Sequence, residues 1–435
     1  MTGDEMQQIK DGYRKTEIGV LPQQWQVVKI NDIAPFIANG FVGAASRYYT
    51  KDESAAGYIM GKNIRANKIE AGSLVRINKE FVAKYPKTKI FAGDMLTIQS
   101  GHAGISCIVT KEFDNANCHA VIISRFNREL ACPDYLAYYL NSFHGKTRLK
   151  RIFVGTTMNH LNTKDLKLFR VPLPPLLEQQ RIAEILIATD AHLEKLDAVI
   201  KDTQLLKKTM IEKLLTRGIG HAEFKDSEIG LLPKAWEVVS LKEITHLVTK
   251  GTTPSTVGFD YEAKGVNFIK VENIDENGNI NISLTSKITA ECNQKLRRSA
   301  MQEHDILVSI AGTIGKSAIV KGTDLPANTN QAVAIIRLKL FNSLDKNYLN
   351  FIFSSNYFYD YIKSIGTAGA QPNINLKQLK NFIFPLPGIA EQKNITNILL
   401  EFKKSLDLYN NARKDFMELK KGLMKKLLTG EIRIK

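Results

Sequence analysis

The chain has 435 residues, of which 44% are hydrophobic, so it can bury more than one core and is not predicted to be disordered. Its formal charge of +16 and pI near 9.4 favour a polyanionic partner, with nucleic acid ahead of an anionic membrane surface. It contains no apolar run of about 18 residues, and its N-terminus lacks the apolar core of a signal peptide. These features argue against a membrane span and secretion, and we expect a cytoplasmic location.

The first recognisable element is a short segment, residues 17–28, that recurs at residues 228–239. The copies read EIGVLPQQWQVV and EIGLLPKAWEVV, and they contain both tryptophans of the chain, Trp25 and Trp236. Self-similarity at a long period indicates a duplicated unit. The match continues in the same order with Asn63-Ile64 and Asn273-Ile274, residues 101–106 and 312–317, Tyr135-Leu136 and Tyr348-Leu349, residues 171–179 and 384–392, and residues 206–216 and 419–429.

Each opening segment leads into a globular region with short β-branched runs. Residues 120–124 and 332–336 are examples, and Gly, Asn and Asp interrupt such runs, which predicts a mixed α/β domain with much sheet. We predict an N-terminal segment and first domain at residues 1–172 and a first long helix at 173–220. A second domain at 221–385 and a second long helix with a C-terminal tail at 386–435 complete the chain.

The four cysteines do not form a metal or disulfide pattern. Cys107, Cys118, Cys132 and Cys292 include no C-x-x-C pair and have no histidine at ligand spacing. We therefore expect reduced, partly buried thiols and no metal site.

The segments after the two Pro-rich motifs are predicted to be long helices. Leu-Pro-Pro and Leu-Pro-Gly precede them, and Gly218 and Gly430 follow them, as is typical of helix starts and ends. Apolar residues recur at alternating steps of four and three, which is a heptad seam. The predicted seam residues are Ile182, Leu186, Thr189, Leu193, Leu196, Ile200, Thr203, Leu206, Met210 and Leu214 in the first helix, and Ile395, Leu399, Phe402, Leu406, Tyr409, Phe416, Leu419, Leu423 and Leu427 in the second, with Arg413 as an interruption.

Two arrangements can bury such a seam. Each helix can pack on its own globular domain, or the two can pair as an antiparallel coiled coil, which their equal lengths favour. The sequence around Gly430, joined to residues 13–19, nearly repeats the junction at residues 214–230. The chain is therefore effectively circular, and a pseudo-twofold dumbbell with adjacent termini is the predicted architecture.

Catalytic motifs are absent from the sequence. Gly315-Lys316-Ser317 lacks the first glycine of a phosphate-binding loop, because Ile310 stands at that position. No Asn/Asp-Pro-Pro-aromatic loop of an adenine methyltransferase is present, and Glu262-Ala-Lys264 has no carboxylate at nuclease spacing. The histidines of the first half have no histidine counterparts in the second. We therefore predict no catalytic residues and a binding function.

Several of these motifs resemble one family. Residues 172–183, their partial copy at 385–396, the Leu-Leu-Thr-Gly end and the Ile-Gly-x-Leu-Pro-x-x-Trp openings are similar to the specificity (S) subunit of type I restriction-modification systems. The resemblance covers nearly the whole chain. It implies two target-recognition domains, each reading half of a split DNA site, with the long helices as spacer and docking surface.

The resemblance also implies the partners. Two modification subunits would bring S-adenosylmethionine and methylate adenine, and two restriction subunits would bring ATP-driven translocation and cleavage. No cofactor is expected in this chain, whereas S-adenosylmethionine, ATP and Mg²⁺ are expected on the partners. Glu178, Gln179, Glu391 and Gln392, at the N-terminal ends of the helices, are the predicted docking residues.

Polar and basic residues on glycine-punctuated loops are the candidates for DNA contacts, because cations meet phosphates and Arg, Lys or Asn read base edges. In the first domain they are Ser46, Arg47, Asn63, Arg65, Lys146, Arg148, Lys150, Arg151, Thr156 and Thr157. In the second they are Lys270, Glu272, Asn273, Lys295, Arg297, Arg298, Lys316, Thr367, Gln371 and Asn373.

Two other functions stay open on the sequence. One is the specificity subunit of a modification-only methyltransferase complex or a standalone DNA-binding protein. The other is a coiled-coil scaffold that does not bind DNA, whose behaviour would not depend on salt.

Overall fold

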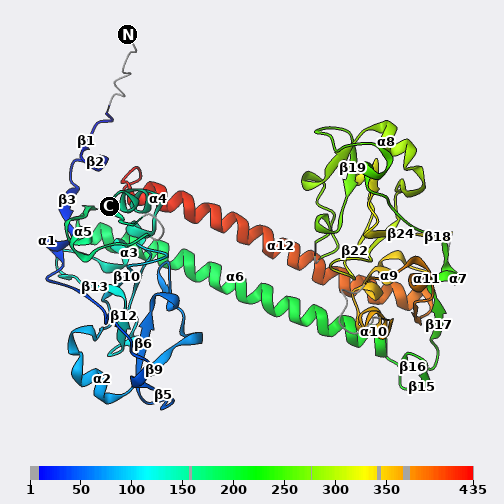
Figure 1. The fold of residues 1–435 in the computed structure, drawn as a ribbon, viewed down its shortest axis with the longest axis horizontal. Coiled ribbons are helices and arrows are strands. Elements are labelled where there is room, and N and C mark those ends of the chain that lie inside the picture. Colours follow the sequence, from blue (N-terminus) through cyan, green and yellow to red (C-terminus); the bar gives the residue numbers. More distant parts are fainter. Residues whose placement is uncertain (1–8, 156–158, 276, 340–343, 366–372, 435) are drawn as a thin grey trace, which may run out of the picture. The chain divides into compact units, whose positions relative to one another are not determined.

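The computed structural model describes residues 9–155, 159–275, 277–339, 344–365 and 373–434, and it divides into two compact units (Figure 1). The first unit comprises Met1–Asp197 with Ala412–Lys435, and the second comprises Ala198–Asn411. The division falls inside two long helices, α6 (Leu176–Arg217) and α12 (Ile389–Leu428). Each unit therefore contains a globular domain together with part of both helices.

The first unit is built on two four-stranded sheets. The inner sheet has the order β11 (Ser106–Ile108), β10 (Met95–Ile98), β13 (Val121–Arg125) and β4 (Phe36–Asn39), and its pairs are antiparallel. The outer sheet has the order β12 (Asn117–His119), β6 (Ala56–Met60), β9 (Val75–Ile77) and β5 (Tyr49–Thr50), in which β12 and β6 run parallel. Shorter pairs are β1 (Tyr13–Thr16) with β2 (Gly19–Pro22), β3 (Gln26–Lys29) with β14 (Arg170–Leu173), and β7 (Ile64–Arg65) with β8 (Lys68–Ile69).

The helices of this domain are short. They are α1 (Ile30–Ile33), α2 (Lys79–Lys84), α3 (Pro133–Asn141), α4 (Phe143–Leu149) and α5 (Thr163–Leu168). Helix α3 is almost fully buried, and the hydroxyl of its Tyr135 donates to the Pro172 carbonyl at 3.1 Å. This contact ties the domain to the strand that leads into α6.

The second unit repeats this plan. Its inner sheet has the order β18 (Thr245–Lys250), β24 (Val333–Leu338), β21 (Ile306–Ser309) and β22 (Ser317–Ile319). Its outer sheet has the order β20 (Ser286–Ile288), β19 (Val266–Ile269) and β23 (Ala327–Thr329), again with one parallel pair. The hairpin β15 (Phe224–Ser227) with β16 (Gly230–Pro233) and the pair β17 (Glu237–Ser240) with β25 (Ile383–Leu386) match β1–β2 and β3–β14. Its helices are α7 (Leu241–Ile244), α8 (Ala290–Lys295), α9 (Lys346–Phe353), α10 (Asn356–Ile365) and α11 (Leu376–Lys380).

Individual interactions repeat as well as strands. Arg125 holds Asp94 through two hydrogen bonds of 2.8 Å, and Arg337 holds Asp305 through bonds of 2.8 and 2.7 Å. Both aspartates are buried, so each charge is compensated by a paired guanidinium. The duplication predicted from the sequence is thus confirmed at the level of topology and side-chain pairing.

Both cores recruit the two long helices. In the first unit, Ile182 and Leu186 near the start of α6 share a core with Leu427 and Leu428 at the end of α12. In the second unit, the end of α6 and the start of α12 meet in the same way, for example through Leu214 and Leu399. Since a start meets an end in each unit, the helices pack antiparallel there, as predicted.

Three residues of the predicted seam are exposed. One is Phe416, which is 38% exposed and stacks on His192, and the prediction is wrong at the other two. Leu206 and Leu419 are 50% and 52% exposed, and the partly buried positions are the next residues, Lys207 and Lys420. Around Thr203 the buried positions recur at steps of four and four, so the helix departs from a strict heptad at this point. A lysine can occupy such a position because its aliphatic stem packs while the ammonium group reaches the edge.

Candidate nucleic-acid interface

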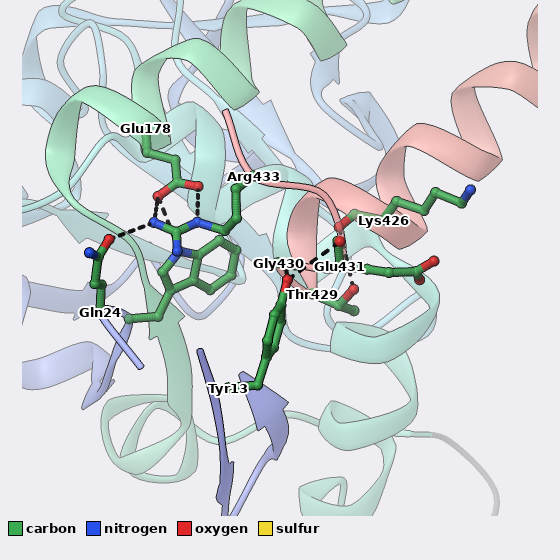
Figure 2. Close-up of polar contacts among 9 residues, drawn as sticks. Tyr13, Gln24, Glu178, Lys426, Thr429, Gly430, Glu431 and Arg433 are labelled. Atoms are coloured by element: carbon green, nitrogen blue, oxygen red, sulfur yellow. Dashed lines mark hydrogen bonds and ion pairs between the residues drawn. The ribbon is translucent and has the colours of Figure 1, made fainter. Parts of the chain in front are cut away.

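A buried carboxylate ties the start of the first long helix to both ends of the chain (Figure 2). Glu178 Oε2 accepts from Trp25 Nε1 at 3.1 Å, and both its oxygens accept from Arg433 at 2.6 and 2.8 Å. Nearby, the Tyr13 hydroxyl donates to the Gly430 carbonyl at 2.7 Å. The hydrogen bonds that Arg433 donates to the Glu178 carboxylate raise the pKa of Arg433. These contacts close the N-terminal segment, α6 and the C-terminal tail into one structure.

The second unit has the corresponding carboxylate, Glu391. It accepts from Trp236 Nε1 at 2.9 Å, from the Ile219 amide at 3.0 Å, and it contacts His221 Nε2 at 2.8 Å. The residues around Glu391 come from the continuous stretch that follows α6. Those around Glu178 come from two separate segments, one near Trp25 and one near Arg433. The predicted correspondence between the mid-chain junction and the two end segments therefore has a direct structural counterpart.

The neighbouring glutamines are also internal. Gln179 accepts from the Cys132 amide at 2.9 Å and donates to the Pro174 carbonyl at 2.8 Å, and Gln392 makes the same kind of contacts with Asp345 and Pro387 at 2.8 Å each. Both glutamines are fully buried and Glu178 is 5% exposed. The expectation that these residues face partner subunits is therefore corrected for Glu178, Gln179 and Gln392, because their buried side chains hold the domains to the helices. Glu391 is 19% exposed, and its docking role stays a prediction.

The outer sheet of the first unit carries cations on an aromatic cluster. Phe41, Tyr48, Tyr58, Phe81 and Tyr85 pack with ring centroids between 4.7 and 6.3 Å apart. The exposed Arg47 guanidinium lies over the Tyr48 ring at 4.6 Å and donates to its hydroxyl at 2.7 Å, a bond that raises the Arg47 pKa. Lys84 lies near Tyr85 at 5.8 Å. A permanently charged donor is thus held on a rigid platform.

A histidine borders this cluster. His119 Nδ1 lies 3.0 Å from the Tyr58 hydroxyl, and burial lowers the pKa of the imidazole while it raises that of the phenol. Both shifts favour neutral groups, so the hydrogen bond joins two uncharged side chains.

The outer sheet of the second unit also presents cations next to aromatic rings. Lys270 lies over Tyr261 at 4.4 Å and Lys295 lies over Phe259 at 5.5 Å. Arg298 donates to the Lys250 carbonyl and to Thr252 at 3.4 Å each, and Arg297 is exposed beside it. Lys84 and Lys295 both end the short helix that follows the corresponding strand, so the two platforms lie at matching places on the repeat.

Two predicted base readers are buried. Asn63 accepts from the Met60 amide at 3.1 Å and donates to the Glu70 carbonyl at 3.3 Å, while Asn273 accepts from Lys270 at 2.8 Å and donates to Leu284 at 3.1 Å. They are 0% and 3% exposed. Their amides complete a turn after the outer strand, so in this structure they offer no edge to a base.

The predicted basic cluster of the first domain is divided by its contacts. Lys146, Lys150 and Arg151 are exposed on and just after α4. Arg148 instead donates to the Tyr139 hydroxyl and the Arg170 carbonyl at 2.7 Å each and lies over Phe169. Arg148 therefore holds α4 against the domain, and the other three cations remain candidates for phosphate contacts.

The remaining candidates are dispersed. Ser46, Glu272 and Asn373 are exposed, Arg65 pairs with Glu70 at 3.0 Å, and Lys316 is half-buried and donates to the Ile274 carbonyl at 3.1 Å. Four others lie outside the described residues: Thr156, Thr157, Thr367 and Gln371.

Other kinds of site were also sought in the part of the chain that the structure describes. Within it, no group of three or more His, Cys, Asp or Glu side chains could hold a metal ion. Three of the four cysteines are buried, and burial raises the pKa of each of the four thiols. None of the described helices combines the length and apolar character that crossing a bilayer requires.

The aromatic platforms were missed by the sequence analysis. The rings of the first unit's platform are spread over residues 41–85, so no local motif marks them. The available signal was the clustering of Phe41, Tyr48, Tyr58, Phe81 and Tyr85 with Arg47 and Lys84 in a single segment of the first domain.

Comparisons with known proteins agree with this geometry. The family model of the type I restriction modification DNA specificity domain matches residues 22–202 and 233–417. The putative type I restriction enzyme MjaX specificity subunit of Methanocaldococcus jannaschii is 29% identical, with 98% of each chain covered. The EcoKI specificity subunit of Escherichia coli K12 is 21% identical over 95% of this chain and 90% of its own.

Solved structures show the same fold. The S subunit of a type I restriction-modification system from M. genitalium superposes with a TM-score of 0.57 at 17% identity, covering 93% of this chain and 96% of its own. A chain from a structure of type I R-M complex assembly gives 0.56 at 19% identity, covering 95% and 99%.

Proposed function

The chain belongs to the family defined by the type I restriction modification DNA specificity domain, and from that premise we propose that it reads a two-part DNA target, one part with each unit. The observation that carries this proposal is the repetition of one scaffold with different exposed side chains. Arg47 lies over a tyrosine ring in the first unit, whereas in the described part of the second unit no arginine does so and Lys270 lies over Tyr261. Two copies of one fold that expose different side chains are suited to reading two different half-sequences.

The exposed cations divide into two roles in this proposal. Lys146, Lys150 and Arg151 in the first unit and Arg297 in the second suit phosphates, which position a protein on DNA without reading sequence. Arg47 suits a base edge, because a guanidinium held by stacking can donate two hydrogen bonds to guanine.

The chain serves as the non-catalytic subunit of a larger complex. Two modification subunits would supply S-adenosylmethionine and adenine methylation, two restriction subunits would supply ATP- and Mg²⁺-dependent cleavage, and the complex would act in the cytoplasm. Apolar side chains that the long helices leave exposed support docking there, namely Ile187, Leu205, Leu206, Leu408, Met417 and Leu419. The comparisons do not favour the DNA-independent scaffold.

Methylome sequencing tests the two-part reading. The chain, expressed with the modification subunit of its own system, should direct methylation at one interrupted motif. Replacing residues 40–169 with those of a relative should change one half of that motif and leave the other half unchanged, because the units read independently. Changes in both halves, or a continuous motif, would contradict the proposal.

Salt dependence tests the phosphate contacts. For the complex with the modification subunit, the triple variant Lys146→Gln, Lys150→Gln, Arg151→Gln should reduce the slope of log affinity against log salt by about 2–3. A matched triple variant of exposed lysines on the long helices, Lys195→Gln, Lys201→Gln and Lys414→Gln, controls for net charge. Equal slopes in the two variants would mean that Lys146, Lys150 and Arg151 do not contact DNA phosphates.

A further inference from the structure

A carboxylate lies at the centre of a polar network between α3, α6 and α12 in the first unit. Asp190 of α6 accepts from the Tyr138 hydroxyl at 2.7 Å and forms an ion pair with Lys420 of α12. The Lys420 and Asp190 side chains are only 24% and 27% exposed. The negative charge of Asp190 therefore compensates a half-buried ammonium group and also satisfies a phenol.

The repeat places different chemistry at the same three positions of the second unit. The alignment of Glu178 with Glu391 and of Tyr135 with Tyr348 puts Lys403 in place of Asp190 and Phe351 in place of Tyr138. Lys207 takes the place of Lys420. The second unit thus lacks the carboxylate and the hydroxyl at these positions. It has the ammonium groups of Lys207 and Lys403 at the positions that Lys420 and Asp190 occupy in the first unit.

These two lysines are not neutralised by an ion pair. Among the described residues neither forms a salt bridge, and Lys403 donates only a long hydrogen bond of 3.5 Å to the Gly278 carbonyl. Burial lowers the pKa of Lys207, and the charge of Lys403 lowers it further. Asp407 and Asp275 act in the opposite direction on both lysines, but they do not cancel the effect.

Two cavities open at this place. One of about 520 Å³ is lined by Lys207, Lys208 and Asn350 together with the Asp275 carboxylate. Another of about 380 Å³ is lined by Lys403, Lys321 and Asn350 together with the Glu303 and Asp407 carboxylates. Asn277 and Gly278 of the turn after Asp275 line both. The Asn350 Oδ1 atom is buried and has no hydrogen-bond partner among the described residues, so this acceptor lacks a donor.

We propose that this region of the second unit binds an oxyanion of the phosphate class between Lys207 and Lys403, in the place that the Asp190 carboxylate fills in the first unit. The anion would accept from both ammonium groups, with Lys208 and Lys321 close enough to add to the positive field. The same chemistry has two sources, a free phosphate or phosphate ester and a phosphate of the DNA backbone.

Thermal unfolding of the full-length chain tests the free source. Inorganic phosphate, compared with chloride at equal ionic strength, should raise the Tm by roughly 3–5 °C for each tenfold increase above its Kd. The variant Lys403→Asp restores the arrangement of the first unit and should abolish this dependence. Lys207→Gln, a milder change, should abolish it as well. Lys414→Asp, an exposed position of α12 outside both cavities, should keep it.

DNA binding tests the other source. If the backbone supplies the anion, phosphate will leave the Tm unchanged, while Lys207→Gln and Lys403→Asp each reduce the salt slope of DNA binding by about 1. If free phosphate is the ligand, both variants will bind DNA with the wild-type slope. The site is refuted if phosphate stabilises Lys403→Asp as much as the wild type, or if neither phosphate nor DNA distinguishes the variants.

Discussion

Glu178 shows how one residue can serve two purposes at a helix start. It lies in the first turn of α6, where a carboxylate interacts favourably with the unpaired amides of the helix, and it also accepts from Trp25 and Arg433. Its counterpart Glu391 has the same position in α12 but meets a histidine rather than an arginine. The carboxylate is repeated, whereas its basic neighbour is Arg433 in the first unit and His221 in the second.

Removing the charge of Glu178 should destabilise the first unit. Glu178→Gln leaves the buried side of Arg433 without its ionic partner, and we expect a loss of about 2–3 kcal/mol in the free energy of unfolding. Glu184→Gln, an exposed change on the same helix, should stay within about 0.5 kcal/mol. Denaturant unfolding followed by circular dichroism measures both, and similar midpoints would argue against the closing role of Glu178.

Gly430 is required for a steric reason. Its φ of +72° is in the left-handed region, and an added Cβ would lie 2.6 Å from Pro22. Gly430→Ala should therefore cost about 2–4 kcal/mol, since strain and a clash add together. Gly312 has φ of +75° with nothing within 4 Å, so Gly312→Ala reports the backbone strain alone and should cost about 1 kcal/mol. Equal shifts in Tm would mean that Pro22 moves aside freely.

The residue scale is where sequence reasoning was weakest. Asn63 and Asn273 stand on glycine-punctuated loops, and composition alone cannot distinguish an asparagine that completes a turn from one that reads adenine. Likewise, Glu178 and Gln179 were predicted to dock partner subunits because they begin a helix that the family resemblance makes a docking surface. Their burial depends on Trp25 and on the distant Arg433, which no local pattern connects to them.

The long helices were predictable as elements, because proline starts, glycine ends and apolar periodicity agree. The register failed near Lys207, where a leucine and a lysine are adjacent and hydrophobicity favours the leucine. The structure buries the lysine stem and exposes Leu206 instead. Lys207 and Lys420 occupy matching positions in the repeat, and both are partly buried. The sequence alone does not show that these lysines belong to the seam, because that requires knowing which residues they face across it.

This register can be measured by truncation. Ile200 is 8% exposed, so Ile200→Ala should cost about 2–4 kcal/mol through lost burial and a residual cavity. Leu206→Ala removes a side chain that is half exposed and should cost less than about 0.5 kcal/mol in the isolated chain. A strict heptad predicts similar losses, so comparable destabilisation of the two variants would restore the original seam.

At the scale of the whole molecule, duplication explains why much of the fold could be predicted from the sequence. Comparing the two copies predicts the domain order, the ends of the long helices and the effectively circular arrangement. Contacts between the helices add the register, because Asp190 pairs with Lys420 and Asp197 with Arg413, seven residues further along α6 and seven residues earlier in α12. By this register Val199 lies opposite Asn411, so a matched lengthening of the pair requires one insertion after Ala198 and one after Asn411.

Such a paired insertion tests whether the helices set the spacing between half-sites. Four residues lengthen each helix by about 6 Å and rotate it by about 40°, and B-DNA rises 3.4 Å per base pair. The methylated motif should therefore gain one or two base pairs of spacer while both half-sequences stay the same. Inserting a single copy after Ala198 breaks the register and should lower the Tm instead. An active complex with both insertions and an unchanged spacer would show that the helices bind the domains together without measuring the DNA between them.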